Sequence, residues 1–158
     1  TQGVISMDMK FNIYAFISRP TAEVFEAVAD PKELSSYFTT GGAKGRLETG
    51  ATVTWDFHDF PGAFPVEVVE VEPNKKIVLR WEANDQEAKA KYMTTVTITF
   101  EPIDGDTRTK VSISEEGWHE TEGGLKAAYG NCMGWSQVVA ALKMWVEHGI
   151  NLRDGMYK

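Results

Sequence analysis

Hydrophobic and polar residues alternate along several short segments of the chain, which is the pattern of strands with one buried face. The first segment is 11–19, in which Phe11, Ile13, Ala15 and Ile17 share one face. From about residue 44 to 116 the pattern is strand after strand, and the alternation is clearest over 52–58, 65–72, 76–83, 92–100 and 109–115. Because the connections are short, with turns predicted at 61–62 and 104–106, the sheet is predicted to be an antiparallel meander with one covered face.

Strand parity decides which side chains face the covered side of the sheet. The alternation within 52–58 and 76–83 predicts that Trp55 and Trp81 face inward. Within 65–72 the valines change phase after Val68, which predicts a bulge.

Three segments have helical spacing. Residues 21–30 are predicted to form a helix with Thr21 as its N-cap, and a second short helix follows Pro31 and runs to Phe38. A long helix is predicted from about residue 122, with Gly149 ending it. Its apolar stripe, which would cover the sheet, comprises Cys132, Trp135, Val138, Val139, Leu142, Trp145 and Val146. This order predicts an α+β fold, β-α-α-β6-α, in which a strongly curved antiparallel sheet grips the C-terminal helix and encloses a hollow.

Five stretches of the chain resemble one protein superfamily, and together they span nearly its whole length. They are SRPTAEVFEAVADPKELSSYFT (18–39), ETGATVTWDF (48–57), VVEVEPNKKIVLRWE (68–82), TVTITFEP (95–102) and GWSQVVAALKMWVEHG (134–149). In this order they resemble the helix-grip superfamily of START-like and birch-pollen-allergen-like proteins, also called SRPBCC. Within it, the chain is most similar to the family named after the heat-shock-protein-90 ATPase activator. That family usually has a tryptophan where this chain has Tyr37. We expect one domain of this class over 1–158.

The resemblance implies a ligand-sized cavity between the sheet and the last helix. Members of the superfamily bind lipids, polyketides or other apolar small molecules, some act as cyclases, and others bind a partner protein. Because function does not follow from fold, three hypotheses stay open. They are a binding protein for a small hydrophobic molecule, a cyclase- or hydrolase-type enzyme, and a cochaperone-like module that contacts a chaperone in a stress response. A homodimer is also left open.

The charge balance argues against two classes of partner. The chain has 16 Lys and Arg against 23 Asp and Glu, with a formal net charge of −7 at pH 7. Nucleic acids and anionic membranes are bound mainly through Lys and Arg, so we expect neither as a partner. No long apolar window and no secretory signal are visible, and the single cysteine cannot form an internal disulfide, so we expect a cytoplasmic protein.

No metal or cofactor is predicted. His58, His119 and His148 lie in different elements without metal-ligand spacing, and no phosphate loop or dinucleotide motif occurs. The enzyme hypothesis therefore depends on acid–base residues at the expected mouth of the hollow. Glu116 would act as a general acid if it were buried beside Trp118, with His119 nearby.

The candidate ligand-binding residues are the aromatic and apolar side chains aimed at the predicted hollow, together with one amide. Asn131 is the polar residue on the inward stripe of the last helix, where it either braces the sheet or orients a ligand. Aromatic rings suit a flat apolar ligand. The candidate set comprises Trp55, Phe57, Trp81, Tyr92, Trp118, Asn131, Trp135 and Val138.

Overall fold

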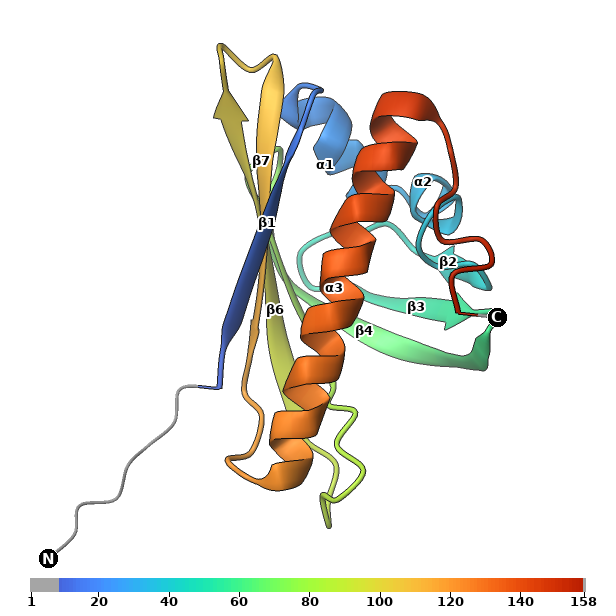
Figure 1. Cartoon of the computed structure of the whole chain (residues 1–158), viewed down its shortest axis with the longest axis vertical. Coiled ribbons are helices and arrows are strands. Elements are labelled where there is room, and N and C mark those ends of the chain that lie inside the picture. Colours follow the sequence, from blue (N-terminus) through green and yellow to red (C-terminus); the bar gives the residue numbers. More distant parts are fainter. Residues whose placement is uncertain (1–8, 158) are drawn as a thin grey trace, which may run out of the picture.

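The chain folds into a curved sheet that wraps around one long helix, as the computed structural model of residues 9–157 shows, side chains of residues 60 and 61 excepted (Figure 1). The elements follow in the order β1 (Phe11–Ile17), α1 (Thr21–Ala29), α2 (Pro31–Ser35), β2 (Gly42–Lys44), β3 (Thr52–Phe57), β4 (Phe60–Glu72), β5 (Lys76–Glu82), β6 (Met93–Ile103), β7 (Arg108–Glu116) and α3 (Glu122–His148). The predicted α+β helix-grip fold, β-α-α-β6-α, is confirmed.

The sheet has seven antiparallel strands in the order β1-β7-β6-β5-β4-β3-β2. The register between β4 and β5 shifts between Val68 and Glu70, which confirms the predicted bulge. A second shift lies between Trp55 and Phe57, where β3 pairs with β4. Because bulges increase the local bend and twist of a strand, they help this half of the sheet curl around α3.

The core fills the space between the concave face of the sheet and α3. The alternating residues of β3, β5, β6 and β7 supply the sheet side, and Val139 and Leu142 of α3 pack against them. Tyr37, after α2, is buried, and its hydroxyl donates to the backbone oxygen of Ala27 in the last turn of α1 at 2.9 Å. Burial raises the pKa of Tyr37 well above its usual range, so the hydroxyl remains a donor. An aromatic side chain therefore keeps the packing role at the position where the family usually has tryptophan.

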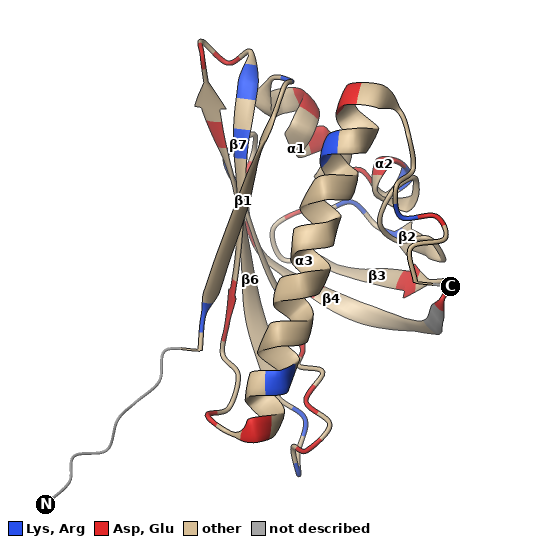
Figure 2. Ribbon diagram, viewed as in Figure 1, with Lys and Arg blue, Asp and Glu red and all other residues tan. Residues whose placement is uncertain are grey.

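Both ends of α3 have recognisable caps. Thr121 accepts a hydrogen bond from the backbone nitrogen of Gly124 through its Oγ1 at 3.0 Å. Gly149 adopts the left-handed conformation, with φ of 67°, and ends the helix as predicted. Between Lys126 and Lys143 the helix carries no charged side chain (Figure 2). One face of this uncharged middle portion packs against the sheet and lines the pocket described below.

Three local predictions are wrong at the level of caps and turns. Thr21 is the first residue of α1 rather than its N-cap, and its backbone nitrogen donates to Asp106 Oδ1 at 2.9 Å instead. The short helix α2 ends at Ser35 rather than Phe38. The turn predicted at 61–62 lies at 58–59, because Asp56 Oδ1 accepts from the backbone nitrogens of Phe57 and Gly62 and so closes a tighter hairpin.

No helix within residues 9–157 is long and apolar enough to cross a membrane.

Candidate functional site

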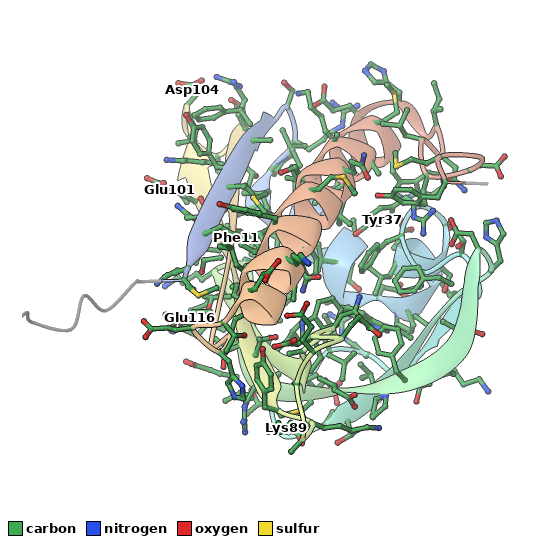
Figure 3. The ribbon with its side chains drawn as sticks, turned by 60° about the horizontal axis from the view of Figure 1, so that its bottom comes forward. Phe11, Tyr37, Lys89, Glu101, Asp104 and Glu116 are labelled. Atoms are coloured by element: carbon green, nitrogen blue, oxygen red, sulfur yellow. The ribbon has the colours of Figure 1, made fainter. Side chains whose placement is uncertain are left out.

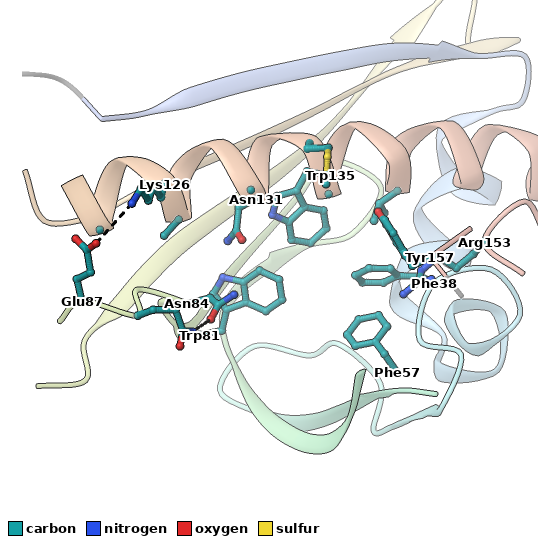
Figure 4. Close-up of a pocket in the computed structure, with 17 residues that line it drawn as sticks. Phe38, Phe57, Trp81, Asn84, Glu87, Lys126, Asn131, Trp135, Arg153 and Tyr157 are labelled. Atoms are coloured by element: carbon teal, nitrogen blue, oxygen red, sulfur yellow. Dashed lines mark hydrogen bonds and ion pairs between the residues drawn. The ribbon is translucent and has the colours of Figure 1, made fainter. Parts of the chain in front are cut away.

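A pocket of about 720 Å³ lies between α3, the strands β3 and β5, and the segment that follows α3 (Figure 4). Aromatic and aliphatic side chains from distant parts of the sequence form its middle. The helical spacing of α3 turns Trp135 and Val138 toward the sheet, and the alternation of β3 and β5 turns Phe57 and Trp81 toward the helix. Phe38 completes this part of the wall.

Trp81 and Trp135 occupy the centre of the pocket wall. Their ring centroids are 5.4 Å apart, with the planes tilted by 33°. Phe38 packs 5.7 Å from Trp135 on the other side. Contacts at these distances hold the rings against each other, so the protein's own packing maintains the aromatic wall.

A carboxylate, Glu115 on β7, is buried directly behind this wall and is 0% exposed. Four neutral groups donate hydrogen bonds to it. Trp135 Nε1 lies 2.9 Å from Oε1, Trp81 Nε1 lies 3.0 Å from Oε2, and Thr94 Oγ1 lies 2.6 Å from Oε2. The amide nitrogen of Asn131 lies 3.0 Å from both carboxylate oxygens. Donors on both oxygens replace the water that a carboxylate loses on burial.

Sequence reasoning missed Glu115, although a usable signal was present. Val111, Ile113 and Glu115 follow one another at the period of two, and all three are buried. A carboxylate that continues an inward-facing row of aliphatic residues is expected to be buried and to need polar partners. Asn131, the inward amide of α3, is one of those partners, so it braces the helix against the sheet.

One end of the pocket is closed by a buried ion pair. Arg153, in the segment after α3, donates from Nη2 to Asp59 Oδ1 at 2.9 Å and makes a second bond to Oδ2, and both side chains are buried. The guanidinium holds the pKa of Asp59 below its usual range, although burial opposes the shift. The same guanidinium lies over the rings of Tyr157, at 4.5 Å, and Phe57, at 5.6 Å. Arg153 and Tyr157, which follow the last helix, were not predicted as site residues.

The other end of the pocket is polar and open. Asn84, Gln86 and Glu87, from the connection between β5 and β6, face Lys126 of α3. Lys126 Nζ lies 3.6 Å from a carboxylate oxygen of Glu87, and both side chains are largely exposed (Figure 4).

Five of the predicted ligand-binding residues line the pocket, and three do not. Those that line it are Phe57, Trp81, Asn131, Trp135 and Val138. Trp55 faces inward as predicted but is fully buried behind the wall, 5.8 Å from the ring of Trp81. Tyr92 and Trp118 belong to a separate small cluster with Phe11, near the start of α3.

The acid–base residues of the enzyme hypothesis do not converge on the pocket. Glu116 points away from the body of the molecule and pairs with Lys10 at 3.8 Å, because Glu115 takes the inward position and its neighbour must face outward (Figure 3). The condition for Glu116 to act as a general acid, burial beside Trp118, is therefore not met. His119 is exposed and stacks on Tyr92, with the ring centroids 3.7 Å apart. Neither of the two residues proposed for acid–base chemistry, Glu116 and His119, lines the pocket.

Among residues 9–157, no group of three His, Cys, Asp or Glu side chains is arranged to hold a metal ion.

The architecture defines the chain as a helix-grip protein with a pocket between sheet and helix. Residues 18–147 match the family described as "Activator of Hsp90 ATPase homolog 1-like protein", and the chain belongs to this family, which is part of the SRPBCC superfamily. The resemblance seen in the sequence is thereby confirmed. A search of curated proteins found no relative with a significant match.

Solved structures of similar fold come from several bacteria. Protein MLL2253 from Mesorhizobium loti superposes with a TM-score of 0.75 at 20% identity, over 89% of this chain and 98% of the other. Protein SSP2350 from Staphylococcus saprophyticus gives 0.72 at 25% identity, over 90% and 96%. A structure described as the Aha1 dimer from Colwellia psychrerythraea gives 0.71 at 21% identity, over 89% and 97%. These similarities establish the fold.

Proposed function

We propose that this protein binds a small organic molecule with an apolar, aromatic body in the pocket between the sheet and α3. The observation that carries the proposal is the pocket itself, about 720 Å³ in volume with Phe38, Phe57, Trp81, Trp135 and Val138 in its wall. Sites for small molecules are concave, of roughly 300–1,000 Å³, and are lined mainly by apolar and aromatic side chains with a few polar groups. The family membership and the fold agree with this role.

The middle and the two ends of the pocket would contribute differently to binding. The aromatic middle would bury the body of the ligand, because flat rings and tilted indoles pack well against each other. At the closed end, the ion pair of Arg153 with Asp59 shuts out solvent. At the open end, Asn84, Gln86 and the pair of Glu87 with Lys126 offer polar contacts to whatever part of the ligand reaches solvent.

Filling the pocket is expected to weaken binding strongly without unfolding the protein. Val138→Trp places a large ring in the space beside Trp135, so the affinity for a probe such as 1-naphthylmethanol should fall by about tenfold or more. Isothermal titration calorimetry measures the change, and thermal unfolding verifies the fold. The control is Val69→Trp, because Val69 is exposed on β4 and does not line the pocket. Equal affinities for the wild type and Val138→Trp would place the probe elsewhere.

The partner hypotheses stay predictions. The structure from Colwellia psychrerythraea is described as a dimer of Aha1, and on that ground we keep a homodimer as part of the proposal. Contact with a chaperone rests on the family description alone.

A further inference from the structure

The buried carboxylate behind the pocket wall indicates what charge the ligand carries, and this step rests on the function proposed above. In the part of the chain that the structure describes, no Lys, Arg or His nitrogen lies within 4.0 Å of Glu115. All of its hydrogen-bond partners are neutral donors. Neutral donors solvate a carboxylate, but they do not cancel its charge, and the apolar surroundings screen that charge poorly.

Two indole rings lie between this carboxylate and the pocket, and they respond to its charge. Trp81 and Trp135 both donate their N–H groups to Glu115, at 3.0 Å and 2.9 Å, and both rings line the pocket. An N–H group bonded to an anion polarises its ring, which makes the ring face richer in electrons. The face of an indole already attracts cations through its quadrupole. The wall is therefore a surface on which positive charge is favoured.

The cations that line the pocket do not offset Glu115, because each has carboxylates of its own. Arg153 is paired with Asp59 at the closed end. Lys126 lies 3.6 Å from Glu87 and 3.2 Å from Glu122 at the open end. Figure 4 shows Arg153 and Lys126 at opposite ends, with the two indoles between them. The pocket and its immediate partners thus hold two cationic groups and four carboxylates, so an anionic ligand would meet an excess of like charge.

We propose that the ligand is an organic cation, with a flat apolar body and a protonated or quaternary amine, that binds against Trp81 and Trp135 in the field of Glu115. The aromatic wall buries the body, and the ammonium group lies over an indole face. The ligand itself supplies the positive charge that the protein does not place beside Glu115.

Three probes with the same ring and different charge test the proposal on the wild-type protein. They are 1-naphthylmethylammonium, 1-naphthylmethanol and 1-naphthoate, titrated by calorimetry at neutral pH. The ammonium probe is expected to bind about fivefold or more tighter than the alcohol, and the carboxylate probe about fivefold or more weaker. If the alcohol binds as tightly as the ammonium probe or more tightly, the cation proposal is overturned while the proposed function stands. If none of the three binds, the proposed function fails as well.

Two matched variants test whether Glu115 is the cause. Glu115→Gln removes the buried charge with little change of shape, and the preference for the ammonium probe over the alcohol should fall to about twofold or less. Glu116→Gln removes the same charge one residue away, on the exposed side, and should keep the wild-type preference. A full preference in a folded Glu115→Gln protein would overturn the assignment. If that variant does not fold, the probe series on the wild type decides alone.

Discussion

Glu115→Ala is expected to lower the free energy of unfolding by about 3–5 kcal/mol. The substitution leaves the indole N–H groups of Trp81 and Trp135, the amide of Asn131 and the hydroxyl of Thr94 without their acceptor in a buried place. Each unsatisfied buried donor costs roughly 1–3 kcal/mol, and relaxation around the cavity recovers part of the sum. Urea unfolding measures the loss, which corresponds to about 10 °C in Tm.

The control for this prediction is the neighbouring residue. Glu116→Ala changes the net charge by the same amount, but its carboxylate is exposed and makes only a long ion pair with Lys10. Its effect on the free energy of unfolding should stay within about 0.5 kcal/mol. Similar losses for the two variants would mean that Glu115 has no special structural role.

Arg153→Met is expected to destabilise the protein by about 3 kcal/mol. The substitution keeps an apolar side chain at the closed end of the pocket but leaves the buried Asp59 without its bidentate partner. The double variant Asp59→Asn with Arg153→Met should recover more than half of the loss, because the uncompensated charge is gone. Arg108→Met is the matched control, since the pair of Arg108 with Asp104 is exposed and should contribute less than about 1 kcal/mol.

The destabilisation by Arg153→Met should depend on pH in a defined direction. Arg153 lowers the pKa of Asp59 in the folded state, so the pair stabilises the protein fully above the unfolded pKa of about 3.9. This stabilisation is lost as the pH falls through the lower, folded-state pKa. The difference between wild type and variant should therefore be constant near neutral pH and shrink in acid. A difference that grows below pH 4 would contradict this account of the ion pair.

Periodicity in the sequence predicts the fold well because the fold depends on which faces are apolar. The strands β1 and β3 to β7 and the long helix overlap the segments where alternation and helical spacing place them, and the phase change after Val68 corresponds to a real bulge. The three-residue strand β2 is too short to show an alternation and was not predicted. The errors concern local hydrogen bonds that periodicity does not encode. Thr21 is no cap because the backbone oxygen of Pro20 already accepts from the nitrogens of Glu23 and Val24, so the helix begins one residue earlier. The hairpin after β3 closes early because of Asp56.

The candidate site was harder to predict than the fold. Phe57, Trp81, Trp135 and Val138 lie on strands or on the long helix, where the period determines the direction of a side chain. Trp118 and His119 lie in a connection, and no period applies there. Glu116 was predicted to follow the last strand, but β7 extends to Glu116, so the period of two places Glu115 in the core and Glu116 at the surface. Arg153 and Tyr157 come from a segment without regular structure that tertiary contacts bring to the pocket.

The most direct test of the central claim is to follow the indole N–H resonances of the five tryptophans by NMR while 1-naphthylmethylammonium is added. Trp81 and Trp135 line the pocket and donate to Glu115, whereas Trp118 lies in a separate cluster. We predict saturable shifts of the Trp81 and Trp135 resonances and an unchanged Trp118 resonance. Unchanged Trp81 and Trp135 resonances, or a largest shift at Trp118, would contradict the assignment of this pocket as the binding site.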